Sequence, residues 1–194
     1  MENNMKMKEY FDRLAPLWTA DESEKVIREE IVEMSDFKPG AVIADIGCGK
    51  GVIVPHLLAA NPSCIIEIDI SSEMIRYAKE QWADNRIKFL CGDILQLDVP
   101  LCDAVIVFNA LPHFVSRSEL AKKLASILKI NGTVIIAHSK SRKAINEIHR
   151  EGISETLSAK LQSPLDEYDN FKQYFNLDNA EDNSRMYFIK MTKL

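Results

Sequence analysis

Three glycines within five residues, Gly47, Gly49 and Gly51, are the strongest chemical signal in this 194-residue chain. They follow the short apolar run 41–46 and precede a helical pattern, so they are expected to form a turn between a strand and a helix. Glycine lets the backbone turn sharply and lets a ligand approach it closely. The N–H groups at the start of the next helix are unpaired and can bind that ligand. Asp69 ends the following apolar run, and its carboxylate can accept hydrogen bonds from two ribose hydroxyls.

Two classes of ligand fit a glycine loop followed by a ribose-binding acid. A dinucleotide fingerprint has the spacing G-x-G-x-x-G, whereas this chain has glycine at every second position of 47–51 and then Val52. Asp45 lies at the end of the first strand, where a carboxylate would repel a pyrophosphate but suits a cationic amino group. Both features favour S-adenosylmethionine over a nicotinamide or flavin dinucleotide. A tight turn without a ligand is the remaining interpretation, although such a turn does not need three glycines.

The order of the motifs resembles that of the class I S-adenosylmethionine-dependent methyltransferase family, of the small single-domain type. The resemblance covers residues 40–137. It rests on D-x-G-x-G-x-G at 45–51, the acidic strand end at Asp69, Gly92-Asp93 after the third strand, and Asn-x-x-x-His-x at 109–114. Glu67 is a departure, because the family often has a small residue two positions before the acid. These motifs are specific for the cofactor and carry almost no information about the methyl acceptor.

The resemblance implies a role for each residue of the cofactor site. The glycine loop would admit the methionine part, Asp45 would hold the loop and the amino group, and Asp69 would bind the ribose. Asp93 would face the adenine amino group, and Ile94 would supply a backbone N–H to the ring. Asp93 can instead form a turn and Asp69 can cap a helix, although Ser71 is better placed for that cap. The predicted cofactor site comprises Asp45, Gly47, Cys48, Gly49, Gly51, Asp69, Ile70, Gly92, Asp93, Ile94 and Asn109.

Methyl transfer from a sulfonium is an in-line displacement, which depends mainly on alignment of the acceptor and exclusion of water. A base is needed only if the acceptor loses a proton. Ligands of open α/β sheets lie beyond the carboxyl ends of the strands, where His113 and His138 are expected. We predict that His113 is a base or an acceptor contact and that His138 is a second catalytic candidate, with structural roles as the alternative for both. His56 and His149 fall within predicted helices and are interpreted as structural or solvated.

The residues before the first strand are rich in aromatic side chains, and the resemblance implies a lid there. We predict that Tyr10, Phe11 and Trp18 cover the cofactor and the acceptor, exclude water and meet the sulfonium by cation–π attraction. The alternative is ordinary packing of these side chains against the sheet. Residues 150–175 form a second expected lid, and their apolar side chains would make any pocket beneath them partly apolar.

The composition restricts the partners of the chain. It has 24 basic and 29 acidic side chains, a net charge of −5, and 46% apolar residues. Non-specific affinity for nucleic acid depends on Lys and Arg, and residues 109–112 lack the paired prolines that enzymes methylating a base usually have. We therefore expect a small-molecule acceptor, no nucleic acid, and a monomer or homodimer. A dinucleotide-dependent oxidoreductase and a non-catalytic S-adenosylmethionine-binding module are the alternative functions.

The expected location follows from features that the sequence lacks. No run approaches the roughly 18 apolar residues of a membrane span, and the first residues contain no apolar core of a signal peptide. None of the cysteines belongs to a CxxC pair, so we expect free thiols and no metal site. They are Cys48, Cys64, Cys91 and Cys102. These features predict a cytoplasmic protein without membrane association.

Alternating apolar runs and helical patterns are expected to position these side chains in an α/β, Rossmann-like three-layer sandwich. Strands are predicted at 41–46, 64–70, 87–91, 104–108 and 133–137, and helices at 52–60, 72–82 and 119–128. Before them, apolar spacing at 26–34 predicts a helix with Ser23 as its cap. Strands at 171–177 and 185–191 would add an antiparallel C-terminal hairpin to a mostly parallel seven-stranded sheet. Residues 1–194 are expected to form one domain, made of a helical lid segment (1–36), a cofactor-binding core (40–137) and a C-terminal helix, lid and closing hairpin (138–194).

Overall fold

The computed structural model describes residues 2–152 and 157–194. Within these residues, seven strands form one sheet in the order β3-β2-β1-β4-β5-β7-β6. The strands are β1 (Val42–Ile46), β2 (Cys64–Asp69), β3 (Ile87–Cys91), β4 (Cys102–Phe108), β5 (Leu128–His138), β6 (Phe175–Asp182) and β7 (Tyr187–Lys193). The helices are α1 (Glu2–Leu14), α2 (Lys25–Ser35), α3 (Val54–Ala59), α4 (Ser72–Gln81), α5 (Arg117–Ile127), α6 (Arg142–Gly152) and α7 (Pro164–Tyr168), with short 3-10 turns η1 (Glu22–Glu24) and η2 (Leu111–His113).

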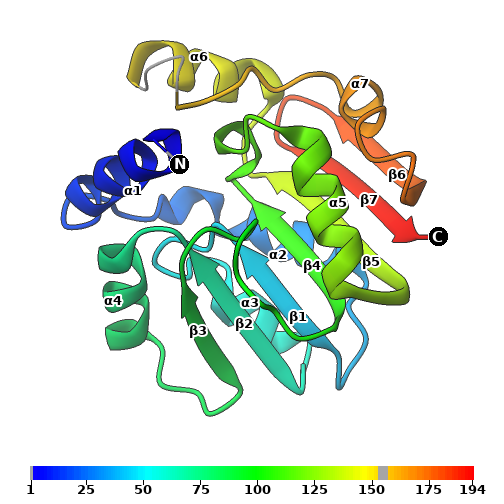
Figure 1. The fold of residues 1–194 in the computed structure, drawn as a ribbon, viewed down its shortest axis with the longest axis horizontal. Coiled ribbons are helices and arrows are strands. Elements are labelled where there is room, and N and C mark those ends of the chain that lie inside the picture. Colours follow the sequence, from blue (N-terminus) through cyan, green and yellow to red (C-terminus); the bar gives the residue numbers. More distant parts are fainter. Residues whose placement is uncertain (1, 153–156) are drawn as a thin grey trace.

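The five strands β3, β2, β1, β4 and β5 are parallel to one another. Strand β7 runs antiparallel to both of its neighbours, β5 and β6. Figure 1 shows α5 on one face of the sheet and α2 and α3 on the other, so the layers are helix, sheet and helix. The predicted Rossmann-like sandwich with its mostly parallel seven-stranded sheet is therefore confirmed. The strand order reverses between β1 and β4, and ligands of such sheets bind at the carboxyl ends of the strands at this switch point.

Strand β4 lies in the middle of the sheet, and its apolar side chains from Ala104 to Phe108 alternate between two core clusters. Val105 belongs to the cluster that contains Leu124 of α5. Ile106 belongs to the other cluster, with Ile31 of α2 and Leu57 of α3. Because both faces of the sheet are covered, the positions of the strand ends are fixed by packing on both sides.

The N-terminal segment is helical, as predicted, but its predicted cap is not observed. Helix α1 extends over Glu2–Leu14 and ends before Pro16. Ahead of α2, the Asp21 carboxylate accepts the Ser23 N–H at 3.0 Å and caps η1. The prediction that Ser23 is the cap is therefore wrong. An Asp two residues earlier satisfies the same kind of unpaired N–H group that a Ser cap would satisfy.

The C-terminal elements begin and end at other residues than predicted. Helix α5 ends at Ile127, before Asn131-Gly132, and β5 begins at once because Leu128 pairs with Cys102 of β4. The closing hairpin is shifted toward the C-terminus, with a turn in which the Asn183 side chain accepts the Met186 N–H at 3.0 Å. The predicted C-terminal helix is observed as α6, which covers Arg142–Gly152, and residues 153–156 lie outside the described residues.

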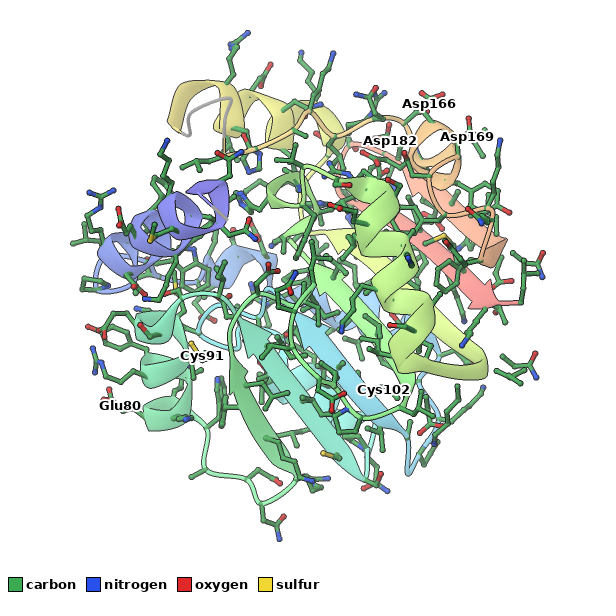
Figure 2. The ribbon with its side chains drawn as sticks, in the orientation of Figure 1. Glu80, Cys91, Cys102, Asp166, Asp169 and Asp182 are labelled. Atoms are coloured by element: carbon green, nitrogen blue, oxygen red, sulfur yellow. The ribbon has the colours of Figure 1, made fainter. Side chains whose placement is uncertain are left out.

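The cysteines are free thiols, as predicted. Cys91 ends β3 and Cys102 begins β4, so Cys91 lies at the carboxyl ends of the parallel strands and Cys102 at their amino ends. Figure 2 shows the two cysteines well apart. Among the helices in residues 2–152 and 157–194, none combines the length and the apolar character that crossing a bilayer requires.

A buried ion pair fastens the C-terminal part to the helical layer. Arg117 at the start of α5 donates from Nε to Glu167 Oε2 of α7 at 3.1 Å, and the two side chains are 7% and 1% exposed. The second carboxylate oxygen of Glu167 accepts the Gln162 N–H at 3.0 Å. Glu167 therefore holds both the Arg117 guanidinium and the backbone that leads into α7.

We expect Glu167→Ala to lower the free energy of unfolding by about 3–5 kcal/mol, because it leaves the Arg117 charge buried without a partner. Urea unfolding followed by circular dichroism measures this loss. The control is Glu80→Ala on α4, which removes an exposed ion pair with Arg76 and is expected to cost less than about 1 kcal/mol (Glu80 is labelled in Figure 2). Equal losses in the two variants would contradict the prediction.

Candidate functional site

The glycine loop connects β1 to α3 and lies across the end of β2. Gly47, Gly49 and Gly51 have φ angles of 74°, 56° and 74°, in the left-handed region that favours glycine. The N–H groups of Gly47 and Cys48 both donate to the carbonyl oxygen of Ile68, at 2.8 and 3.1 Å. The loop therefore sits at the carboxyl edge of the sheet beside the switch point, as the sequence predicts.

The three glycines have different surroundings. A Cβ atom on Gly47 would lie 2.6 Å from Ala110 Cβ, and one on Gly51 would lie 2.7 Å from Trp82 Nε1, so protein atoms occupy both places. A Cβ on Gly49 would meet nothing closer than the Met74 sulfur at 4.0 Å. The open side of the loop is therefore at Gly49, where a ligand can reach the backbone.

Asp69 joins the end of β2 to the glycine loop. Its Oδ2 atom accepts the Gly49 N–H at 2.8 Å and its Oδ1 atom accepts the Ser71 N–H at 2.8 Å. Burial raises the pKa of Asp69, and these two backbone hydrogen bonds oppose that rise. The cap of α4 is Ser71, whose hydroxyl accepts the Met74 N–H at 3.1 Å, as expected. Each carboxylate oxygen of Asp69 retains a second lone pair for a hydroxyl donor.

Two further carboxyl groups are buried beneath the loop. Asp45 of β1 and Glu67 of β2 are register partners, 1% and 0% exposed. Within the described residues the Asp45 oxygens have no hydrogen-bond partner, whereas the Glu67 carboxyl has the Cys48 thiol beside it. Burial raises the pKa of Asp45 to about 8, with a further contribution from the charge of Asp69. Burial and the neighbouring Asp45 also raise the pKa of Glu67. A cation beside a buried carboxyl favours its ionised form, so Asp45 fits a ligand with an ammonium.

Cys48 lies in the same loop and is buried. Burial, followed by the charge of Glu67, raises the pKa of the Cys48 thiol well above its usual value. A neutral thiol is a poor nucleophile, so Cys48 contributes to the site as a small loop residue.

The end of β3 brings Asp93 to the same edge. Its Oδ1 atom accepts the Leu95 N–H at 3.0 Å, and its Oδ2 atom accepts a hydrogen bond of 2.7 Å from the Asn4 side chain of α1. Gly92 donates its N–H to the Asp69 carbonyl at 2.9 Å, which ties this turn to the end of β2. Ile94 is 3% exposed and packs in the core, so only its backbone is available to a ligand. An adenine amino group at Asp93 would compete with Asn4 for one oxygen.

His113 ends η2 after β4 and meets two other rings. Phe11 of α1 lies edge-on at 4.9 Å between ring centres, and His149 of α6 lies edge-on at 5.0 Å. Burial, followed by the nearby His149, lowers the pKa of His113 to about 4. Its Nδ1 atom is 3.4 Å from the Leu157 carbonyl oxygen, which favours a proton on Nδ1 and a lone pair on Nε2. The structure thus places His149 in the candidate site, a residue that the sequence interpretation treats as structural or solvated.

His138 ends β5 but is fully buried. It is 0% exposed, neither ring nitrogen has a partner in the described part of the chain, and its ring lies edge-on to Tyr187 of β7 at 5.9 Å. Burial lowers the pKa of His138 to about 3. His138 therefore lies beneath the rim of the site, and a catalytic role for it stays a prediction that this geometry does not favour.

A hydrogen-bonded link joins the residues that follow β4 and β5 at the carboxyl ends of these strands. Asn109, with a φ of 53°, donates to the Ser139 hydroxyl at 2.9 Å and accepts the Ser139 N–H at 3.0 Å. The same hydroxyl donates to the buried Glu24 carboxylate, which is paired with Lys140. The side-chain amide of Asn109 is thus hydrogen-bonded within the protein. Sequence reasoning did not identify Glu24 as part of this edge.

The N-terminal aromatic residues separate into two groups. Tyr10 and Phe11 lie together on α1, with ring centres 5.2 Å apart, and Phe11 reaches His113. Trp18 follows α1, and its carbonyl accepts a 2.8 Å hydrogen bond from Lys50 Nζ on the other side of the glycine loop. Figure 1 shows α1 beside α4 at the edge of the site, where a lid would lie.

Helix α1 is fastened to α4 by Asp12, which sequence reasoning did not identify. The Asp12 carboxylate accepts the Ser71 hydroxyl at 2.7 Å and the Glu73 N–H at 3.1 Å. Burial raises the pKa of Asp12, but the hydrogen bonds from Lys8 and Ser71 outweigh it and lower the pKa to about 2.

In residues 2–152 and 157–194, no His, Cys, Asp and Glu side chains are grouped to hold a metal ion.

Fold and site together define a Rossmann-like cofactor-binding protein, with a glycine loop, two buried carboxyls and Asp69 at its switch point. The methyltransferase domain model matches residues 43–132. A malonyl-(acyl-carrier protein) O-methyltransferase of Priestia megaterium is 30% identical over 143 residues, which is 71% of this chain and 52% of that protein. The chain spans about half the length of the curated relatives that it matches. It belongs to the class I S-adenosylmethionine-dependent methyltransferase family, whose cofactor is S-adenosylmethionine.

Solved structures share the fold at low sequence identity. The magnesium protoporphyrin IX methyltransferase of Synechocystis PCC 6803, which has S-adenosylhomocysteine bound, has a TM-score of 0.73 and 16% identity, covering 99% of this chain and 100% of that one. The (4+2)-cyclase SpnF has a TM-score of 0.75 and 14% identity, covering 96% and 94%. The family resemblance seen in the sequence is confirmed, and the dinucleotide alternative is set aside. The cyclase shows that this fold does not fix the reaction.

We expect the stability of the cofactor-free protein to fall between about pH 4 and pH 8 because of Asp45. Its folded pKa of about 8 lies above the usual value of 3.8, so folding is favoured while the group holds its proton and disfavoured as pH rises. Asp45→Asn removes this dependence. Urea unfolding of the wild type and the variant at pH 5, 6.5 and 8 measures the pH dependence of the free energy of unfolding. The histidines with lowered pKa values change stability below about pH 6.5 in both proteins, so their contribution cancels in the difference. Parallel curves for the two proteins would contradict the prediction.

We expect His113 to be neutral throughout the physiological range. Burial lowers its pKa to about 4, so its ring proton resonances should not shift between about pH 5.5 and 8. Proton NMR of the histidine rings measures this, with His113→Gln to assign the resonance. A midpoint near 6.5 for His113 would show that its ring is solvated and would refute the packing against Phe11 and His149.

Proposed function

We propose that this protein transfers a methyl group from S-adenosylmethionine to a small-molecule acceptor by in-line displacement. The observation that carries the proposal is the open backbone at Gly49, whose N–H is hydrogen-bonded to the Asp69 carboxylate at 2.8 Å. The bound cofactor would supply an electrophilic methyl group on a sulfonium. The protein's own residues would bind, orient and enclose the reactants.

The residues fit the cofactor in the order that the family resemblance implies. The unpartnered Asp45 carboxyl would receive the ammonium, and the remaining lone pairs of Asp69 would accept the ribose hydroxyls. Asp93 and the Ile94 backbone would hold the adenine, with Asn4 sharing or leaving its Asp93 oxygen. Charge-assisted hydrogen bonds of this kind are the strong ones in a buried site.

The acceptor would lie beside His113, between α1 and α6. Phe11 of α1 and His149 of α6 both contact the ring of His113, and these side chains would exclude water from the methyl group. The neutral His113 ring could accept a proton from an acceptor hydroxyl or amine through Nε2. We propose a single domain in which segment 1–36 is a helical lid, residues 40–137 are the cofactor-binding core, and segment 138–194 supplies a helix, a second lid and the closing hairpin.

A small acceptor is supported by charge and by the surroundings of His113. The net charge of −5 disfavours phosphate backbones, and the rings around His113 suit a compact, partly apolar molecule. The relatives named above act on an acyl-carrier protein conjugate and on a porphyrin, so family membership leaves the acceptor open.

Calorimetry with S-adenosylmethionine and S-adenosylhomocysteine tests the cofactor. We expect dissociation constants near the micromolar range, and no binding of NADH. Failure of both sulfur ligands to bind would refute the proposal. Incubation with methyl-labelled cofactor and a cell metabolite extract then tests the reaction. Label should enter a small molecule, and label found only in RNA or protein would refute the choice of acceptor.

We expect Asp69→Ala to weaken S-adenosylmethionine binding by about 1.5–3 kcal/mol, or roughly ten- to 150-fold, because it removes a charged hydrogen-bond acceptor. The same calorimetry measures this change. Asp84→Ala is the matched control, since Asp84 precedes β3 in an exposed turn and pairs with Arg86. An unchanged affinity for Asp69→Ala would mean that the ribose is held elsewhere.

A further inference from the structure

A pocket of about 560 Å³ lies on the far side of the glycine loop. Its walls are the segment after α1, one face of α2, the start of α3 and the end of α4. Lys50 and Val52 bring the glycine loop into the wall, but the described lining residues include none of the predicted cofactor contacts. Trp18, predicted as part of the lid over the methyl acceptor, lines this pocket.

The pocket contains a buried arginine without an acidic partner. Arg28 of α2 is 4% exposed, and its Nη1 atom donates to the Asp21 carbonyl oxygen at 3.0 Å. Its Nε atom has no partner among the described residues. Hydrogen bonds from Ser23 and, to a smaller extent, the charge of Arg28 lower the pKa of the exposed Asp21 carboxyl, but no salt bridge joins Arg28 to a described carboxylate. A buried guanidinium without a directly paired carboxylate is unfavourable, so an anion that enters the pocket and pairs with it would be stabilised.

Both tryptophans of the chain line the pocket, and Lys50 holds both in place. The Trp82 indole N–H donates to the Lys50 carbonyl at 2.9 Å, and Lys50 Nζ donates to the Trp18 carbonyl at 2.8 Å. Two indole rings on one pocket provide flat apolar surfaces for an aromatic body.

The charge of the lining also favours an anion. Arg28, Lys25 and Lys50 are cationic and Glu22 is the acidic residue of the lining, in a chain whose net charge is −5. His56 lines the pocket as well and can donate one ring N–H in its neutral form. Arginine and lysine together with aromatic surfaces match an oxyanion that carries a planar ring.

We propose that this pocket binds a small oxyanion joined to an aromatic ring. The anionic group pairs with the Arg28 guanidinium, and the ring packs against Trp18 and Trp82. An aromatic carboxylate and a nucleoside monophosphate share this chemistry. The site is separate from the cofactor site, and its occupant would contact the glycine loop through Lys50.

Intrinsic tryptophan fluorescence tests the proposal directly, because the chain's two tryptophans both lie in the pocket. The full chain, first saturated with S-adenosylhomocysteine, is titrated with benzoate, adenosine monophosphate, inorganic phosphate and adenosine. We expect saturable quenching by benzoate or by adenosine monophosphate, which also identifies the favoured anion. Inorganic phosphate, which has no ring, and adenosine, which has no charge, should bind at least about tenfold more weakly than the favoured anion.

Variants separate binding from folding. Arg28→Gln should weaken binding of the favoured probe about tenfold or more, and should leave the melting temperature of the ligand-free protein unchanged or higher, because it removes an unpaired buried charge. Arg142→Gln is the control, since that arginine pairs with Asp182 far from the pocket (Asp182 is labelled in Figure 2). If Arg28→Gln does not fold, the proposal fails in its claim about Arg28, and Trp18→Ala then decides whether the pocket binds the probe at all.

Three results would overturn the proposal. The first is the absence of saturable quenching by either aromatic anion at millimolar concentration. The second is equal binding of adenosine and adenosine monophosphate, which would remove any role for Arg28. The third is competition between S-adenosylhomocysteine and the probe, which would make the pocket a part of the cofactor site. Binding of S-adenosylhomocysteine itself is measured separately, so failure here does not decide the proposed methyl transfer.

Discussion

The hydrogen bond from the Gly49 N–H to the Asp69 carboxylate is the interaction on which the site depends. It fastens a loop of left-handed glycines to the end of the neighbouring strand at 2.8 Å. The other oxygen of Asp69 fixes the backbone at Ser71, which in turn caps α4. One buried side chain therefore sets the positions of the loop, of the β2 end and of the helix that follows. Asp69, the proposed ribose-binding group, is oriented by these two bonds in the ligand-free protein, which would lower the entropy that binding must overcome.

The cofactor site contains two buried carboxyl groups beside Asp69. Asp45 and Glu67 are register partners on neighbouring strands. Burial raises the pKa of both groups, which favours their neutral forms while no cation is present. The layers of apolar side chains on both faces of β1 and β4 supply the stability that permits such groups in the interior. Under the proposed function, Asp45 would receive the ammonium of the cofactor, whereas a pyrophosphate would be repelled by an ionised carboxylate there.

Long-range side-chain contacts complete the edge of the sheet. Asp12 of α1 caps α4, the Asn4 amide binds Asp93, and Glu24 reaches Ser139 after β5. Each contact joins the first 24 residues to a strand end that is far away in the sequence. The N-terminal segment therefore acts on both sides of the loop, toward His113 through Phe11 and toward the opposite pocket through Trp18.

The sequence by itself determined the order of the elements, because hydrophobic periodicity and glycine spacing are local properties. It located the glycine loop, Asp69 and Ser71, and the uniformly apolar run 104–108 at the centre of the sheet. It did not fix the turn of the closing hairpin, which depends on the Asn183 side chain, or the end of α5, which depends on pairing between Leu128 and Cys102. Only the tertiary structure decided which side chains meet. It buried His138, brought His149 against His113, and left Arg28 without a directly paired carboxylate, because burial and partnership depend on residues that the chain brings together only when the sheet is assembled.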